Sequence, residues 1–104
     1  MHGIERAEIE QLKQINLKEY LLSFDKDNYR QRSNGTIVKK DKSHIVIYAD
    51  HSYQFNTTVN PYKDNIGTLQ LLYGWTFMET VEKLRADKKH TTQIGGIPNY
   101  DLFN

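Results

Sequence analysis

The chemistry open to this chain is limited first by the absence of cysteine from its sequence. Without thiols there is no disulfide, no thiolate zinc site and no cysteine nucleophile. The four histidines are scattered, without an i, i+4 pair or an HExxH pattern, so a metal site would need ligands from distant segments. We therefore expect neither a metal nor another cofactor.

The carboxylates give no sign of a catalytic centre. Asp25 and Asp27 form one close pair, Glu79 and Glu82 form another, and Glu79 has a predicted role in capping a helix. Polymerase chemistry needs acidic residues clustered around metal ions in a larger fold, and the sequence has no glycine-rich phosphate loop. The sequence therefore predicts a binding module rather than an enzyme.

Positive charge is concentrated in the middle third of the chain. Residues 25–63 hold seven basic side chains against four acidic ones, whereas the net charge of the whole chain is only +1. An anionic partner would meet this local excess rather than the total. The candidate contacts to single-stranded DNA are five basic residues for phosphates and two tyrosines for base stacking: Arg30, Arg32, Lys39, Lys40, Lys42, Tyr48 and Tyr29. Lysine and arginine are also common on strands that are merely solvated.

The basic residues lie in a segment with the pattern of an antiparallel sheet. Four short runs rich in β-branched and aromatic residues lie between positions 29 and 57, and Asn34-Gly35 is the strongest hairpin signal between them. We therefore expect a meander of three or four strands.

The third hairpin of this meander has two possible registers. A two-residue turn at Asp50-His51 would leave Ile45 and Ile47 on one face with Gln54 and Asn56, and a three-residue turn over 50–52 would exchange the faces. The second register separates apolar from polar residues more cleanly and is preferred. It groups Ile45, Ile47, Tyr53 and Phe55 on one face, and His44, Val46, Tyr48, Gln54 and Asn56 on the other.

Helices are predicted on both sides of the sheet in the sequence. Apolar spacing indicates one helix up to about residue 15 and a second over 17–24, with Asn16 as its N-cap. After a loop over 59–63, a third helix begins at Asp64 and stops at Gly74. Thr76 and Glu79 form a capping box for the last helix, which ends near Asp87, with Phe77, Val81 and Leu84 as its buried stripe. The predicted fold class is α+β: a small antiparallel sheet flanked by N-terminal and C-terminal helices.

Several segments resemble the zinc-binding domain of DnaG-type bacterial primases. Residues 17–21 (Leu-Lys-Glu-Tyr-Leu) are similar to the short N-terminal helix of that domain, and residues 53–55 (Tyr-Gln-Phe) fall on its Tyr-His-Cys-Phe strand. Residues 63–84 carry the most specific similarity. Their Lys-Asp-Asn-Ile, Leu-Tyr-Gly-Trp-Thr-Phe and Thr-Val-Glu-Lys-Leu resemble the family's Gly-Asp-Ala-Ile-Asp-Phe, Glu-Gly-Leu-Ser-Phe and Ala-Val-Glu-Lys-Leu at equal spacing. The resemblance covers about residues 9–86.

The departures from the family are as informative as the similarities. The family binds zinc through three Cys and one His, and the corresponding neighbourhoods here, 31–33 and 55–58, offer no ligand. The chain therefore resembles a metal-free, cysteine-free relative of the kind found near replication genes of plasmids and other mobile elements. The resemblance implies a zinc-ribbon-like fold without zinc and a DNA-replication accessory role, in which the chain binds single-stranded template for a separately encoded primase or polymerase. The alternative is a protein–protein interaction adaptor of a replication complex without DNA binding.

The 104 residues have the length of one domain. We expect the folded module over 1–88 and a flexible tail over 89–104, which lacks periodicity. The candidate partner contacts are three tail residues that could form a docking peptide and one residue that could instead close the core: Tyr100, Leu102, Phe103 and Trp75. No apolar stretch approaches the roughly 20 residues of a membrane helix, and the first ten residues do not resemble a signal peptide. We therefore expect a cytoplasmic protein without a membrane partner.

Overall fold

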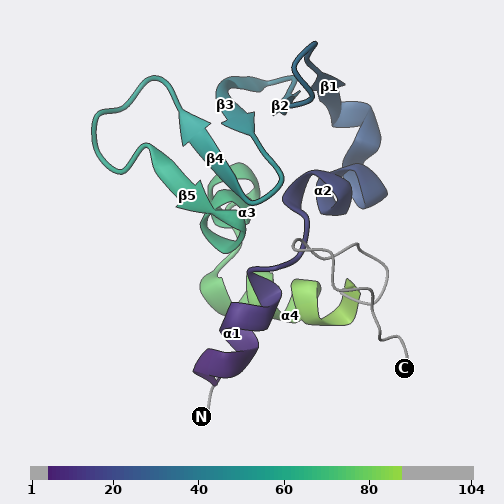
Figure 1. The fold of residues 1–104 in the computed structure, drawn as a ribbon, viewed down its shortest axis with the longest axis vertical. Helices are drawn as coiled ribbons and strands as arrows, with labels where there is room; N and C mark the ends of the chain where they lie inside the picture. Colours follow the sequence, from purple (N-terminus) through teal and green to yellow (C-terminus); the bar gives the residue numbers. More distant parts are fainter. Residues whose placement is uncertain (1–4, 88–104) are drawn as a thin grey trace.

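Residues 5–87 are the part of the chain that the computed structural model describes, and they form four α-helices and one antiparallel sheet (Figure 1). The predicted α+β class is confirmed, and the sheet has five strands rather than three or four. The predicted tail 89–104, with Tyr100, Leu102 and Phe103, lies outside the described residues.

The strands are hydrogen-bonded in sequence order, so the sheet is a simple antiparallel meander. Figure 1 shows α1 and α4 at one end of the molecule and the sheet at the other, with α2 and α3 between them. The elements are α1 (Arg6–Leu12), α2 (Leu17–Asp25), the 3-10 helix η1 (Lys26–Asn28), β1 (Tyr29–Gln31), β2 (Ile37–Lys39), β3 (Lys42–Ile47), β4 (His51–Gln54), β5 (Tyr62–Asp64), α3 (Asn65–Tyr73) and α4 (Phe77–Asp87).

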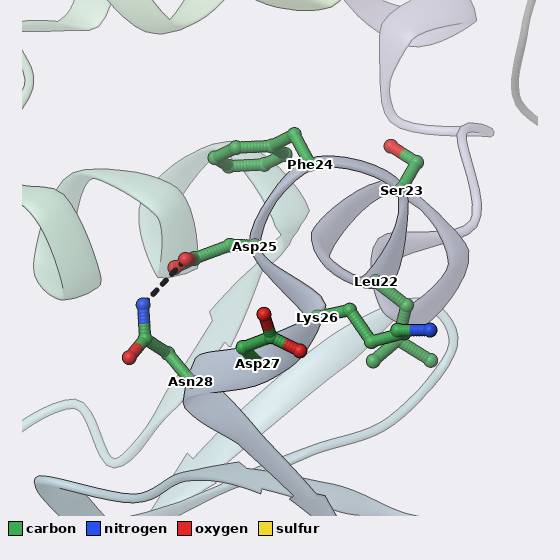
Figure 2. A pocket seen from close by; sticks show the side chains of 7 residues that line it. All are labelled: Leu22, Ser23, Phe24, Asp25, Lys26, Asp27 and Asn28. Carbon is green, nitrogen blue, oxygen red and sulfur yellow. Dashed lines mark hydrogen bonds between the residues drawn. The ribbon is translucent and has the colours of Figure 1, made fainter.

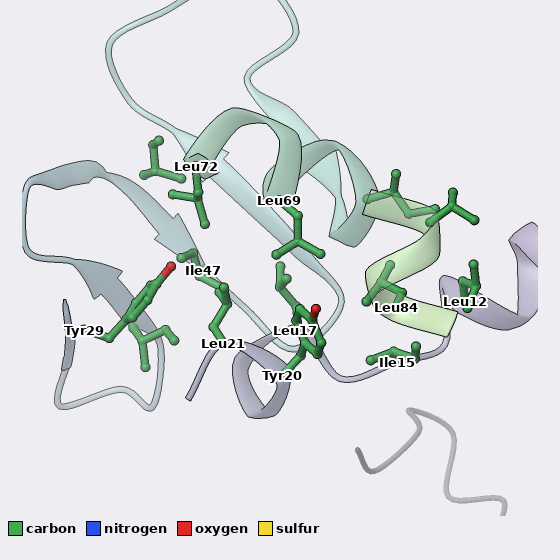
Figure 3. Packing of buried hydrophobic residues seen from close by; sticks show 14 residues of the cluster. Leu12, Ile15, Leu17, Tyr20, Leu21, Tyr29, Ile47, Leu69, Leu72 and Leu84 are labelled. Atoms are coloured by element: carbon green, nitrogen blue, oxygen red, sulfur yellow. The ribbon is translucent and has the colours of Figure 1, made fainter. Parts of the chain in front are cut away.

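The core lies between the helices and one face of the sheet. Alternate residues of a strand point to the same face, and Ile37, Ile45 and Ile47 contribute to the core from β2 and β3. Each buried Leu or Ile side chain stabilises the fold by roughly 1.5–3 kcal/mol. Figure 3 shows the packing of this cluster. The helices and the α1–α2 connection contribute its other apolar residues: Leu12, Ile15, Leu17, Tyr20, Leu21, Ile66, Leu69, Leu72, Val81 and Leu84.

The predicted starts of α2 and α3 are confirmed in atomic detail. The side-chain oxygen of Asn16 accepts a hydrogen bond from the backbone N–H of Glu19 at 3.1 Å, and Asp64 accepts one from Gly67 at 2.8 Å. Each bond satisfies an N–H group that has no partner within its own helix. Gly74 ends α3 at φ 72°, in the left-handed region that glycine adopts without strain.

The capping box of α4 is also confirmed, whereas one residue of its predicted stripe is misplaced. The Glu79 N–H donates to the Thr76 hydroxyl at 3.0 Å, and the Thr76 N–H donates to the Glu79 carboxylate at 2.8 Å. Val81 and Leu84 are buried as expected, but Phe77 is 41% exposed. Phe77 is the first residue of the helix, ahead of the turn that faces the core.

The preferred register of the third hairpin is wrong. β3 pairs Ile45 with Gln54 and Ile47 with Ser52, so the turn is centred on Ala49 and Asp50 rather than on residues 50–52. Gln54 and Ser52 therefore share the face of Ile45 and Ile47, while Tyr53 and Phe55 point away from the core. Separating apolar from polar residues did not predict the register, because the polar Ser52 lies on the buried face, where its hydroxyl forms a hydrogen bond. Its hydroxyl lies 2.7 Å from that of Thr68 on α3.

The sequence does not predict the fifth strand, because it assigns Tyr62 and Lys63 to a loop over 59–63 and Asp64 to the N-cap of the third helix. β5 pairs Tyr62 with Tyr53 and Lys63 with Ser52. Three residues are too few to show the alternation of a strand, and their pairing with β4 decides the structure.

A buried asparagine joins α3 to the end of α1. The side-chain amide of Asn65 donates to the backbone carbonyls of Leu12 at 2.9 Å and of Ile15 at 3.1 Å. Asn65 is buried, and its side-chain oxygen has no hydrogen-bond partner among the described residues. The bond to Ile15 satisfies a carbonyl just beyond α1, whereas the Leu12 carbonyl also accepts from the Ile15 N–H at 3.1 Å.

A chain of hydroxyl groups joins β1, α3 and α2 on the helix side of the sheet. The Tyr29 and Tyr73 hydroxyls lie 2.7 Å apart, and Tyr73 donates to the Asp25 carboxylate at 2.5 Å. Burial raises the pKa of both tyrosines, and the hydrogen bond to Asp25 raises that of Tyr73 further. Both hydroxyls therefore stay protonated in the folded state at pH values where a free tyrosine ionises.

We expect Asn65→Ala to lower the free energy of unfolding by about 2–3 kcal/mol, because the carbonyls of Leu12 and Ile15 lose the buried amide that donates to both. Urea denaturation at neutral pH measures this change. Asn56→Ala is the control, since the exposed Asn56 only accepts a hydrogen bond from Gln54, and its effect should stay within about 0.5 kcal/mol. Equal effects of the two substitutions would contradict the role given to Asn65.

We expect the chain to lose stability as the pH rises above about 10, where tyrosines ionise in the unfolded state but not in these folded positions. The contribution is fully present below that pH. At pH 11 one such tyrosine accounts for a loss of about 1.4 kcal/mol. Urea midpoints between pH 8 and pH 11 should therefore fall less steeply for Tyr29→Phe than for the wild type. Tyr62→Phe, which alters an exposed ring, should keep the wild-type slope.

Candidate nucleic-acid interface

The face of the sheet opposite the core, here called the open face, carries one line of paired residues across all five strands. Arg30 on β1 lies opposite Val38, Val38 opposite Val46, Val46 opposite Tyr53, and Tyr53 opposite Tyr62 on β5. This line spans about 19 Å, because neighbouring strands lie about 4.8 Å apart. A charged guanidinium therefore stands at one edge of the open face and two phenol rings at the other.

Five aromatic rings form a continuous row at the β5 side of the open face. Tyr48 stacks on His51 at 4.4 Å between ring centres, and His51 lies 6.2 Å from Tyr62. Tyr62 lies 4.9 Å from Tyr53, which lies 5.8 Å from Phe55. We call these five residues the aromatic row. Tyr62 is 65% exposed, Phe55 57% and Tyr48 37%.

The alternation of β4 and β5 places the aromatic row. His51 and Tyr53 lie on the open face, whereas Ser52 between them is buried on the core side. The next residue in the alternation, Phe55, continues the row beyond the end of β4. On β5, Tyr62 lies opposite Tyr53 and extends the row to the edge of the sheet. The hairpin register thus decides where all these rings lie.

Three of the predicted phosphate contacts are accessible. Arg30, Arg32 and Lys40 are exposed around the β1–β2 edge, and Lys42 at the start of β3 is partly exposed. The N–H of Arg32 donates to the Thr36 carbonyl within the β1–β2 turn. Arg30 therefore lies on the open face itself, with Arg32 in the β1–β2 turn and Lys40 at the other end of β1, opposite Asn28.

Lys39 and Tyr29 lie on the core side of the sheet, opposite each other on β2 and β1. The Lys39 side chain is only 13% exposed, and its amine pairs with Asp41 at 2.9 Å and lies 5.8 Å from the centre of the Tyr73 ring. Its hydrogen bond holds the pKa of Asp41 below its usual range. Tyr29 is buried, and its hydroxyl is bonded to Tyr73. Neither side chain is placed to contact a ligand on the open face.

Trp75 is partly buried and packs against the core. Its ring lies 4.8 Å from that of Tyr73 and 6.2 Å from that of Phe24, and the Lys83 amine lies 4.9 Å above it. Of the two roles considered for Trp75, closing the core accounts for these contacts.

The sequence-based site included Tyr48 but missed the other four rings. The wrong hairpin register places Tyr53 and Phe55 on the core face, and the predicted loop over 59–63 includes Tyr62. His51 had been read as a turn residue, although it begins β4. The alternation His-Ser-Tyr-Gln-Phe over 51–55 was the available signal, because it places three rings on one face.

Figure 2 shows a hollow at the end of α2, lined by the continuous segment 22–28. The Asp25 carboxylate there accepts hydrogen bonds from Asn28 at 2.6 Å and from Tyr73. These bonds commit Asp25 to holding the fold. Over residues 5–87, no three His, Cys, Asp or Glu side chains are grouped so that they could hold a metal ion.

No helix within the described range has both the length and the apolar composition needed to cross a membrane. Comparisons with protein-family models, with curated proteins and with solved structures found no match to this chain.

Proposed function

We propose that this chain is a non-catalytic module that binds single-stranded DNA on the open face of its sheet and assists a separate primase or polymerase. The aromatic row is the observation that carries this proposal. Proteins that bind single strands without strong sequence preference stack bases on aromatic rings and neutralise phosphates with basic residues near by. The open face supplies both kinds of group.

The arrangement of the rings suits unpaired bases rather than a duplex. Stacking requires the face of a base, and in a duplex these faces are covered by neighbouring base pairs. Tyr62 and Phe55 are more than half exposed and belong to one row, so bases can reach them without a change in the core. Sheets of other single-strand binders stack two or three bases in this way.

The basic residues complete the interface at the opposite edge. Arg30 lies in the same cross-strand line as Tyr53 and Tyr62, and the two valines between them, Val38 and Val46, are buried. A strand whose bases stack on the tyrosines would reach the Arg30 guanidinium by passing over the side chains that cover these valines, while Arg32 and Lys40 add further positive charge near β1. Phosphate contacts of this kind make affinity depend on salt.

The accessory role rests on the resemblance to the zinc-binding domain of bacterial primases and on the residues available for chemistry. Among the described carboxylates, Asp25, Glu79 and Asp64 accept hydrogen bonds that hold the fold. We therefore assign polymerisation to a separately encoded subunit, within a replication complex of a mobile element, and template binding to this chain.

We expect the chain to bind labelled oligo-dT, with affinity that falls as salt rises, and to bind a duplex of equal length more weakly. Tyr62→Ala should weaken oligo-dT binding by at least about fivefold, since one stacked base contributes about 1–3 kcal/mol. Arg30→Ala should weaken binding and reduce the slope of log affinity against log salt by about 0.7, the value for one phosphate contact on a single strand. Fluorescence anisotropy titrations measure both changes.

Two matched variants test whether the losses belong to the open face. Phe77→Ala removes another exposed aromatic ring, on α4, and Lys26→Ala removes another exposed basic side chain, on η1. Both should bind oligo-dT as the wild type does. Absence of oligo-dT binding by the wild-type chain, or equal losses in Phe77→Ala and Tyr62→Ala, would overturn the proposal and favour the adaptor role.

A further inference from the structure

His51 stands within the aromatic row and is held there by two contacts. Its ring is nearly parallel to that of Tyr48, at 4° and 4.4 Å, and its Nδ1 lies 2.6 Å from the Asp50 carboxylate. A carboxylate only accepts hydrogen bonds, so Nδ1 carries a proton in the neutral imidazole. The second nitrogen, Nε2, then has a lone pair when the ring is neutral and an N–H when it is protonated.

The charged groups that face His51 are acidic. Asp50 precedes it in the turn after β3, and Asp64 lies opposite it on β5. Asp64 is itself 3.5 Å from the amine of Lys13, whereas Asp50 is exposed. The neighbouring side chains in the row, Tyr48 and Tyr62, add phenol rings and no basic group. A phosphate that passes this part of the row therefore meets acidic groups unless the imidazole carries a positive charge.

We propose that His51, with Nδ1 held by Asp50, is the phosphate-binding residue of the aromatic row and takes this role when its imidazole is protonated. This inference rests on the proposed function of the open face. In the protonated ring, Nε2–H donates to a phosphate oxygen, while the added charge offsets the carboxylates of Asp50 and Asp64. In the neutral ring, the Nε2 lone pair faces the phosphate and repels it. Single-stranded DNA therefore binds more tightly when His51 is protonated.

The direction of the pH dependence follows from histidine chemistry. Histidine is the side chain that gains a proton as the pH falls from about 8 to about 6, while the phosphodiester stays charged and thymine stays neutral. Oligo-dT binding should therefore strengthen by about fivefold over this interval, the effect of one added charge-assisted hydrogen bond in a hydrated site. The slope of log affinity against log salt should also be shallower at pH 8 than at pH 6, because the phosphate contact of the protonated His51 is missing at pH 8.

The test is an anisotropy titration of the whole chain with oligo-dT at pH 6 and pH 8, using a label whose emission does not change over this range. The wild type should bind about fivefold more tightly at pH 6. His51→Gln keeps a polar side chain but cannot gain a charge, so its affinities at the two pH values should be equal. His44→Gln removes another histidine, on β3, and should keep the wild-type ratio.

The possible outcomes separate this inference from the function on which it depends. Equal wild-type binding at the two pH values, or an unchanged ratio in His51→Gln, would overturn the role of His51 and leave DNA binding in place. If the ratio of affinities is lost in His44→Gln but kept in His51→Gln, the proton that strengthens binding belongs to His44, and the role given to His51 is overturned. Failure of the wild type to bind at either pH would overturn the proposed function itself.

Discussion

The hydroxyl groups of Ser52 and Thr68 share a buried hydrogen bond that fixes β4 against α3. A strand has only two faces, so holding Ser52 inward forces its neighbours His51 and Tyr53 outward. A shift of one residue would place those two rings in the core and Ser52 in solvent. The composition of the open face, and with it the proposed interface, thus depends on one pair of small polar side chains.

Two backbone carbonyls in the hairpin turns of the sheet also accept hydrogen bonds from α2. The Ala49 carbonyl in the β3–β4 turn accepts from the N–H of Leu17, at the start of α2, at 2.7 Å. The Gly35 carbonyl in the β1–β2 turn accepts from the Lys18 amine at 2.8 Å. The first turn of α2 therefore contacts both the β1–β2 turn and the β3–β4 turn. These contacts fix the two hairpin turns relative to each other. The side chains of the open face project from strands whose positions are thus fixed by contacts on the opposite side of the sheet.

Much of the fold could be predicted from short-range signals. Asn16, Asp64 and Thr76 cap their helices, and Gly74 ends one, because each acts through backbone groups only a few residues away. The register of β4 could not be predicted in this way, since it depends on a hydroxyl 16 residues further along the chain. The same limit applies to β5, whose pairing with β4 gives it the form of a strand.

The residues of the candidate site also differ in whether local sequence could predict their position. Arg30 and Tyr48 could be chosen from residue type and local alternation, and both lie on the open face. Tyr29 and Lys39 were chosen by the same criteria, but their strands turn them to the core, where Tyr73 contacts both. Residue type indicates which side chains could bind DNA, whereas only the pairing of strands decides which of them meet a ligand.

The two outermost strands of the sheet are each only three residues long. Long, flat edges with unpaired backbone groups recruit strands from other molecules and lead to aggregation. β5 is also preceded by Pro61, which lacks a backbone N–H, and ends at Asp64, whose side chain caps α3. A sheet that exposes aromatic rings on its face therefore offers only short edges to the strands of another molecule.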